Sequence, residues 1–278
     1  MFSVELSPLS RRTEAILSAP FEWCWIDGGA VQIIDSSEWE MVHSGSAGGD
    51  FQVEGFAIAK YPITNAQYQR FIDAPTGQTN AAWWAFSPEA MQWRKDRPKP
   101  RPTAFAGPTL PRTRVSWFDS MAFCAWLSNE LIEKDEMSTF DIQNVASWCV
   151  RLPTEQEWQR AAVGDSGFSY PWGNELHESR ANYGDLVGQP TPVDAYPTGQ
   201  SPFGVMDMVG NLADWCLTRW GEDSVEVTGY TYRVVKGGAW NISHPEYLRA
   251  IDRTGTGPRG VLNDGGFRIV YEESNHRK

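Results

Sequence analysis

The sequence lacks the features that mark membrane-spanning, secreted and nucleic-acid-binding proteins. Its 278 residues contain no run of 18 apolar residues, and the first 20 contain no apolar core of a signal peptide. The 24 basic residues are outnumbered by 35 acidic ones, which leaves a net charge of −11. Binding to a phosphate backbone requires a basic surface instead. We therefore expect a cytoplasmic protein with no membrane and no nucleic-acid partner.

Cysteine and histidine are scarce, and neither residue type is spaced for metal binding. The four cysteines form no C-x-x-C pair, which excludes zinc-ribbon and thioredoxin-type sites. Three lie in tryptophan-flanked apolar runs, so we expect buried thiols, with a disulfide or a reactive thiol as alternatives. The histidines show no ligand spacing and are expected at the surface. These residues are Cys24, Cys124, Cys149, Cys216, His43, His177, His244 and His276.

Tryptophan, glycine and proline are plentiful instead. The 14 tryptophans, 25 glycines and 18 prolines favour a large aromatic core wrapped in loops over a helical bundle. No internal repeat or low-complexity tract occurs, and glycine and proline are spread without marking a linker. The length allows two domains, but one domain is the better interpretation.

Three segments begin with a helix-capping signature. A hydroxyl residue is followed three positions later by a side chain that can reach back to the backbone. The pairs are Thr64 with Gln67, Ser116 with Asp119, and Thr154 with Glu157. They predict helices over residues 65–72, 117–131 and 155–162, the second with one apolar face.

Strand signals are short and separated by loops. Runs rich in β-branched and aromatic residues predict strands over 31–34, 56–59, 232–235 and 267–271. One loop-like segment, 93–115, carries seven basic residues against a single acid, Asp96. We interpret it as an exposed loop with solvated charges, the alternative being a surface that steers an anionic partner.

Eight segments, taken in order, resemble the formylglycine-generating-enzyme (sulfatase-modifying-factor) family. They are WIDGG (25–29), IAKYPITNAQYQRF (58–71), VSWFDSMAFCAWLS (115–128), RLPTEQEWQRAA (151–162), YPWGN (170–174), FGVMDMVGNLADW (203–215), RVVKGGAW (233–240) and GFR (266–268). The resemblance covers residues 21–272. It implies a loop-rich α+β fold of the C-type-lectin-like kind, with a few helices on a small twisted antiparallel sheet. Residues 1–20 would be an N-terminal extension and 273–278 a C-terminal tail.

Members of this family differ in their chemistry, so the fold does not fix the function. Some are oxidases that bind copper through two cysteines. Others are the second domain of iron-dependent sulfoxide synthases, variable ligand-binding proteins of retroelements, or modules beside bacterial caspase-like or signalling proteins. Matching by motif places the oxidase cysteines at Pro245 and Ala250, and Ala213 replaces a motif tryptophan. The sequence also lacks a three-histidine iron cluster. We therefore expect neither copper nor iron.

Calcium is the metal that the resemblance does imply, in a structural role. One site would use the side chains of Asp207 and Asp214 and the carbonyls of Gly210 and Leu212. The other would use the side chains of Asn182 and Asp185 and the carbonyls of Tyr183 and Val187. Carboxylate and carbonyl oxygens are the ligands that calcium prefers. The alternative for Asn182 and Asp185 is that they cap a turn.

The resemblance places a ligand surface in segment 241–264, between two strands that would hold it rigidly. We interpret the chain as a non-catalytic module that binds a protein or peptide through this surface. The expected ligand-binding residues are Asn241, Ser243, His244, Glu246, Tyr247, Asp252, Arg253, Thr254, Arg259 and Asn263.

Two other functions stay open. An enzyme of the family, metal-dependent or protein-modifying, could use Asp252, Arg253 and Arg249 on an anionic substrate, with Ser243 or Tyr247 assisting. The sequence supplies no nucleophile with its base for it. A regulatory partner subunit in a bacterial caspase- or defence-type assembly is the other possibility. Trp83, Trp84 and Trp93 would suit its protein contacts, unless they only pack a loop.

Overall fold

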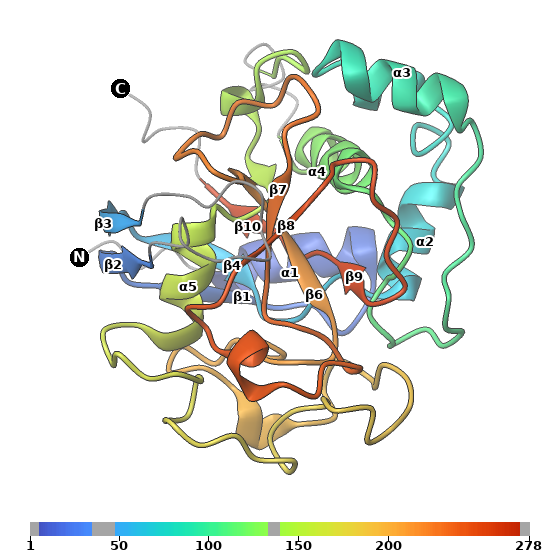
Figure 1. Cartoon of the computed structure of the whole chain (residues 1–278). Coiled ribbons are helices and arrows are strands. Elements are labelled where there is room, and N and C mark those ends of the chain that lie inside the picture. Colours follow the sequence, from blue (N-terminus) through green and yellow to red (C-terminus); the bar gives the residue numbers. More distant parts are fainter. Residues whose placement is uncertain (1–5, 35–47, 133–139, 273–278) are drawn as a thin grey trace.

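The computed structural model describes residues 6–34, 48–132 and 140–272 (Figure 1). In chain order, its elements begin with α1 (Leu6–Leu17), β1 (Trp23–Ile26), β2 (Gly29–Ile33), β3 (Gly49–Val53), β4 (Phe56–Ala59), α2 (Asn65–Asp73), η1 (Ala81–Trp84), α3 (Pro88–Asp96) and α4 (Trp117–Leu131). They continue with η3 (Val145–Ser147), β5 (Val150–Arg151), α5 (Glu155–Val163), η4 (Pro197–Gly199), β6 (Ala213–Arg219), β7 (Arg233–Lys236), η5 (Pro245–Leu248), β8 (Thr254–Thr256), β9 (Gly265–Gly266) and β10 (Val270–Tyr271). Short strands and long loops confirm the expected α+β class.

Two four-stranded sheets and one hairpin organise these elements. The first sheet has the order β1-β4-β10-β5, with antiparallel pairs throughout. The second has the order β8-β7-β6-β9, in which β6 and β9 run parallel and the other pairs antiparallel. Strands β2 and β3 form the separate hairpin. In Figure 1, α2 and α4 lie to one side of the strands, and α5 lies with the hairpin on the other.

All three predicted capping boxes are present and begin the predicted helices. The side chains of Thr64, Ser116 and Thr154 accept from the backbone N–H three residues on. The third helical residue returns the bond to the cap backbone in each case. Each cap satisfies N–H groups that a helix start would otherwise leave open, which stabilises it by about 1 kcal/mol.

Helix α4 differs from the prediction of one apolar face, because it is buried almost all round. Helices α1 and α2 and the turn η1 cover it, and its Phe123 stacks on Tyr68 with ring centroids 5.7 Å apart. Trp83, Trp84 and Trp93 are also buried in this core. These tryptophans therefore pack the structure and do not form an exposed contact surface.

Helix α1 was not predicted, and it packs on the core. Leu9 and Leu17 are buried, and the Trp23 indole donates to the Thr13 hydroxyl at 3.0 Å. Residues 6–17 are thus part of the packed structure, whatever sequence precedes them. Within the described residues, no helix has the length and apolar character needed to cross a membrane.

Candidate functional site

Segment 241–264 leaves the second sheet through two glycines and returns to it as a strand. Gly237 and Gly238 follow β7 with φ of 92° and 64°, a region that glycine adopts readily. A Cβ on Gly238 would lie 2.6 Å from a Leu248 side-chain carbon, so glycine is needed there. The segment then forms η5 and pairs as β8 with β7, Thr254 opposite Val235. Both ends of the segment are therefore fixed to the sheet.

The structure brings most of the predicted ligand residues to the surface. Those that are exposed are Asn241, Ser243, His244, Glu246, Tyr247, Thr254, Arg259 and Asn263. Around η5, the His244 Nδ1 lies 3.3 Å from a Glu246 carboxylate oxygen, and its ring packs edge-on against Tyr247. Asn241 donates to the Asp264 carboxylate at 3.0 Å, which links the two ends of the segment.

Asp252 and Arg253, which were expected to bind the ligand, do not belong to this exposed surface. Both are buried. The Arg253 guanidinium pairs with Glu155 of α5 and packs on the Trp220 ring at 4.9 Å. Glu155 also lies 3.5 Å from the ammonium of Lys236 on β7. Arg253 therefore anchors the segment to α5 and β7.

Burial shifts the pKa values of two ionisable groups in and beside this anchor. Burial raises the pKa of Asp252 to about 6 and lowers the pKa of Lys236, because both groups are more weakly solvated than in water. No pattern in the sequence predicts this anchor, because Glu155 lies 98 positions from Arg253. Two of the three charged residues proposed for an alternative enzyme, Asp252 and Arg253, are thus buried rather than lining an open groove, and Arg249 is half-buried.

The positions matched to the oxidase cysteines are structural here. Pro245 begins η5, and its carbonyl accepts from the Tyr170 hydroxyl at 3.0 Å. Ala250 is fully buried, and its N–H donates to the Ser169 carbonyl at 2.7 Å. These bonds hold η5 against the loop after α5.

The four cysteines lie elsewhere and are all buried, as predicted. Burial raises the pKa of Cys24 to about 11, and it also raises the pKa of Cys124 and of Cys216. A thiol reacts and binds metal as the thiolate. These three side chains therefore stay protonated near neutral pH.

The expected calcium site with Asp207 and Asp214 lies in the loop before β6 and at the start of that strand. Asp214 is buried, and its Oδ2 accepts from the Trp158 indole at 2.9 Å and from Arg268 Nε at 2.6 Å. Its Oδ1 is buried without a hydrogen-bond partner among the described residues. The Gly210 carbonyl accepts from the Leu212 N–H at 2.6 Å. Burial raises the pKa of Asp207 to about 7, against a hydrogen bond from Asn211.

The other expected calcium site, with Asn182 and Asp185, is packed against the Asp207–Asp214 site. A Cβ on Gly210 would lie 2.2 Å from the Asn182 carbonyl oxygen, and Asn182 Oδ1 is buried without a partner in the described part of the chain. Asp185 and Val187 are exposed, and the Tyr183 carbonyl accepts from Leu186 at 3.3 Å. Each expected site therefore contains one buried side-chain oxygen that has no hydrogen-bond partner among the described residues. No group of three or more His, Cys, Asp or Glu side chains gathers in the ranges that the structure describes.

The prediction that the histidines lie at the surface is confirmed for the two that the structure describes. His177 and His244 are exposed, whereas His43 and His276 lie outside the described residues. The basic segment 93–115 differs from the prediction of a solvated loop. Residues 93–96 complete α3, and Arg112 is buried.

Comparison with known proteins agrees with these features. A family model described as the sulfatase-modifying factor enzyme 1-like domain matches residues 15–273. Hercynine oxygenase of Mycobacterium tuberculosis is 31% identical over 239 residues, which cover 79% of this chain and 53% of that protein. The inactive C-alpha-formylglycine-generating enzyme 2 of Mus musculus is 30% identical over 259 residues, covering 78% and 75% respectively.

Solved structures share the fold. Treponema denticola variable protein 1 superposes with a TM-score of 0.63 at 19% identity, covering 92% of this chain and 96% of that one. PvdO from Pseudomonas aeruginosa gives 0.62 at 20% identity, covering 91% and 94%. The chain spans about half the length of the hercynine oxygenase that it matches.

Proposed function

Because this chain belongs to the sulfatase-modifying-factor (formylglycine-generating-enzyme) family, we propose that it is one of its non-catalytic members, a module that binds a protein or peptide through segment 241–264. The observation that carries the proposal is the state of the two matched cysteine positions. Pro245 holds the start of η5 and Ala250 is fully buried, so neither position offers a thiolate. Copper(I) sites in proteins depend on soft thiolate ligands.

The shape of segment 241–264 supports binding. It carries exposed polar and aromatic side chains on a backbone that is held in its middle by Arg253 and by the pairing of β8 with β7, while Asn241 and Asp264 link its two ends. A rigid display lowers the entropy lost on binding. Tyr247 and His244 present an aromatic pair on η5, and tyrosine is enriched among the residues that dominate binding energies.

Calcium is the metal that we propose for this scaffold. Asp207, Asp214 and the carbonyls of Gly210 and Leu212 would hold one ion, and the Asn182 to Val187 turn a second. The support is the buried Oδ1 of Asp214 and of Asn182, neither of which has a hydrogen-bond partner in the part of the chain that the structure describes. A bound cation would satisfy these oxygens and fix loops that have few sheet or helix hydrogen bonds.

The enzymatic alternative rests on the similarity to hercynine oxygenase. It would require a metal site built from residues other than cysteine. A regulatory role inside a larger assembly is the third candidate, and it shares the binding surface with the first. Metal content separates the enzyme from the other two.

The first experiment is elemental analysis of the purified protein after gel filtration. We expect about one or two calcium ions per chain, with copper and iron far below one, because the donors are oxygens. Copper or iron at one ion per chain would overturn the non-catalytic proposal.

The second experiment selects binders from a displayed library of 12-residue peptides. Tyr247→Ala is expected to weaken the selected peptides by about tenfold or more, since it truncates an exposed aromatic at the centre of the surface. Val225→Ala, at an exposed position outside the segment, is the matched control. Equal loss in both variants would contradict a binding role for η5.

A further inference from the structure

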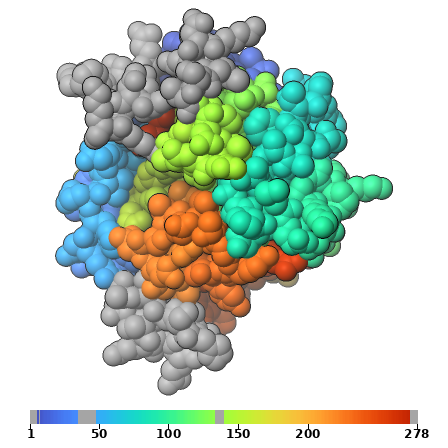
Figure 2. All heavy atoms as spheres, turned by 90° about the horizontal axis from the view of Figure 1, so that it is seen from above, coloured from blue at the N-terminus to red at the C-terminus, as the bar shows by residue number. Residues whose placement is uncertain are grey.

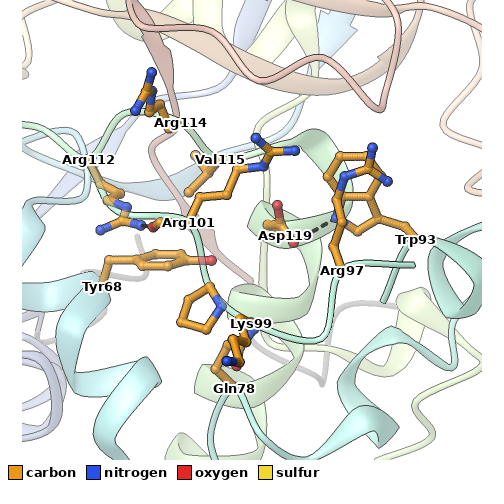
Figure 3. Close-up of a pocket in the computed structure, with 11 residues that line it drawn as sticks. Tyr68, Gln78, Trp93, Arg97, Lys99, Arg101, Arg112, Arg114, Val115 and Asp119 are labelled. Atoms are coloured by element: carbon orange, nitrogen blue, oxygen red, sulfur yellow. Dashed lines mark hydrogen bonds between the residues drawn. The ribbon is translucent and has the colours of Figure 1, made fainter. Parts of the chain in front are cut away.

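A small pocket lies beneath the basic segment that joins α3 to α4 (Figure 3). Its floor is the Tyr68 side chain from α2, and one wall is Asp119 from the first turn of α4. Five cationic side chains line it, namely Arg97, Lys99, Arg101, Arg112 and Arg114. The enclosed volume is about 10 Å³, close to what one water-sized group occupies.

The Tyr68 hydroxyl is a free donor in this pocket. The residue is 3% exposed, and its hydroxyl makes no hydrogen bond to any part of the chain that the structure describes. Figure 3 shows the hydroxyl pointing toward the middle of the pocket. Burial raises the pKa of Tyr68, so the group keeps its proton at neutral pH. The hydroxyl oxygen itself is not fully buried, so it is accessible from the pocket and can donate to a bound acceptor.

Arg112 is a buried cation without a carboxylate partner. It is 4% exposed, packs on the Tyr68 ring at 4.6 Å and donates to the Arg101 carbonyl. It forms no ion pair with any described residue, and its Nε has no partner. Burial lowers the pKa of Arg112, although a guanidinium stays charged at neutral pH. An anion in the pocket would offset the cost of this charge.

The pocket's one carboxylate is already engaged. Asp119 Oδ1 accepts from the Trp93 indole at 2.9 Å, and Oδ2 accepts from the Ser116 hydroxyl at 2.7 Å. Lys99 and Arg101 at the rim are exposed and form no ion pair within the described ranges. The pocket is therefore strongly cationic in a protein whose net charge is −11.

This pocket borders the proposed ligand surface. Arg114 Nε donates to the Asn263 side chain at 2.8 Å, and the Arg114 N–H donates to the Leu262 carbonyl. Arg259 lies 3.5 Å from Asp96 of α3 and packs between the rings of Trp93 and Tyr230. On the face shown in Figure 2, the turquoise residues around α3 lie beside the orange residues near position 230. A chain lying across segment 241–264 would thus reach the pocket.

We propose that this pocket binds a carboxylate of an acidic peptide, with one carboxylate oxygen accepting from the Tyr68 hydroxyl and neighbouring acidic side chains meeting Lys99 and Arg101. The volume admits about one oxygen atom, so one oxygen of the acidic group would enter the pocket while the rest of that group stays at the rim. Several rim cations in a row favour a peptide with more than one acid over a single small acid. This proposal deepens the proposed function, because it names the chemical class of the peptide.

The test uses fluorescein-labelled octaglutamate and fluorescence anisotropy on the full chain. We expect saturable binding at about 50 mM NaCl that weakens several-fold at about 300 mM, because salt screens exposed charges. Tyr68→Phe removes only the hydroxyl and is expected to lower affinity by about tenfold. Lys99→Glu is expected to lower it by about fivefold or more. Lys95→Glu makes the same charge change on the exposed side of α3, outside the pocket, and is expected to change affinity by less than about twofold.

Three results would overturn the proposal. They are the absence of saturable octaglutamate binding, an equal effect of Lys95→Glu and Lys99→Glu, or tighter binding of a phosphotyrosine peptide or of a single-stranded oligonucleotide than of octaglutamate. The rim variants are exposed, so they report on binding even if Tyr68→Phe unfolds the chain. Tyr247→Ala separates the two proposals. If Tyr247→Ala changes neither the affinity for octaglutamate nor the affinity for the displayed peptides, the pocket proposal is supported and the proposed role of the η5 surface is contradicted.

Discussion

Buried arginine side chains in two regions of this molecule differ in the groups that they contact. Beneath the sheets, Arg268 is held by Asp214 and Arg253 by Glu155, each in a buried ion pair. Beneath the basic segment, Arg112 is just as buried but meets a carbonyl and a tyrosine ring instead of a carboxylate. A paired buried charge serves the fold, because removing its partner leaves an uncompensated ion. A buried charge that lacks a counter-ion can still attract an anionic ligand.

Arg233 shows that a missing carboxylate is not enough to mark a binding site. It is fully buried, donates to the carbonyls of Leu217 and Glu226, and packs on Trp117 at 3.9 Å. Burial lowers the pKa of Arg233 to about 9. What sets Arg112 apart is the open tyrosine hydroxyl and the exposed cations around it.

Removal of Arg268 is expected to cause the largest loss of stability among these variants. Arg268→Met leaves Asp214 buried with one indole donor, and we expect the free energy of unfolding to fall by about 3 to 5 kcal/mol. Urea unfolding followed by tryptophan fluorescence measures it. Adding Asp214→Leu to this variant should restore part of the loss. A decrease in the free energy of unfolding of less than about 1 kcal/mol would show that the ion pair is not structural.

Arg253→Met tests the second pair and should cost somewhat less, about 3 kcal/mol, because Glu155 keeps Lys236 at 3.5 Å. Hydrogen exchange should also quicken in β8, since the anchor of segment 241–264 is lost. Arg249→Met, at a half-buried arginine without an ion pair in the described structure, is the matched control. Equal effects of the two variants would refute the anchoring role.

The buried carboxyl group of Asp252 makes the free energy of unfolding depend on pH. It faces Lys236, Arg249 and Glu246, yet burial dominates and its folded pKa is about 6, above the ordinary 3.8. The folded state therefore holds the proton more tightly than the unfolded state does. Its contribution is fully present below about pH 4 and is lost as pH rises through 6, by about 2 to 3 kcal/mol.

Asp252→Asn removes this term. The difference in unfolding free energy between wild type and variant, measured by urea at pH 4, 5, 6 and 7, should change across that window. Parallel curves for the two proteins would refute the raised pKa. Measuring the difference cancels the other carboxyl groups, which titrate in both proteins.

Arg112→Met should give the smallest change in stability. No buried carboxylate loses its partner, so we expect a shift within about 1 kcal/mol, of either sign. Octaglutamate affinity should nevertheless fall by about tenfold, because a charge facing the ligand is removed. A loss of about 3 kcal/mol would place Arg112 with Arg268 and end the distinction.

The elements set by local chemistry could be predicted from the sequence. The capping boxes at Thr64, Ser116 and Thr154 need only residues three positions apart, and all three are present. Helix α3 also had a local signal, Ser87 before Pro88, that sequence reasoning passed over. The family motifs placed the matched cysteine positions and the loop that carries the candidate surface.

The partners of distant residues could not be predicted. Asp252 and Arg253 lie in a polar stretch that is typical of a surface, and only the approach of Glu155 and Trp220 buries them. Tyr68 sits at a helix position that the sequence marks as core. Its one open hydroxyl depends on how α2, α4 and the basic segment meet, which no spacing along the chain encodes.

The place of β10 in the first sheet has a consequence for synthesis of the protein. This strand inserts between β4 and β5, with Val270 opposite Ile58 and opposite Arg151. The Ile269 and Phe267 carbonyls also accept from the Ala59 and Ile63 N–H groups. The sheet therefore cannot close until residue 271 has left the ribosome. Such long-range pairing slows folding and leaves one edge of β4 and one edge of β5 without a partner strand until β10 is added.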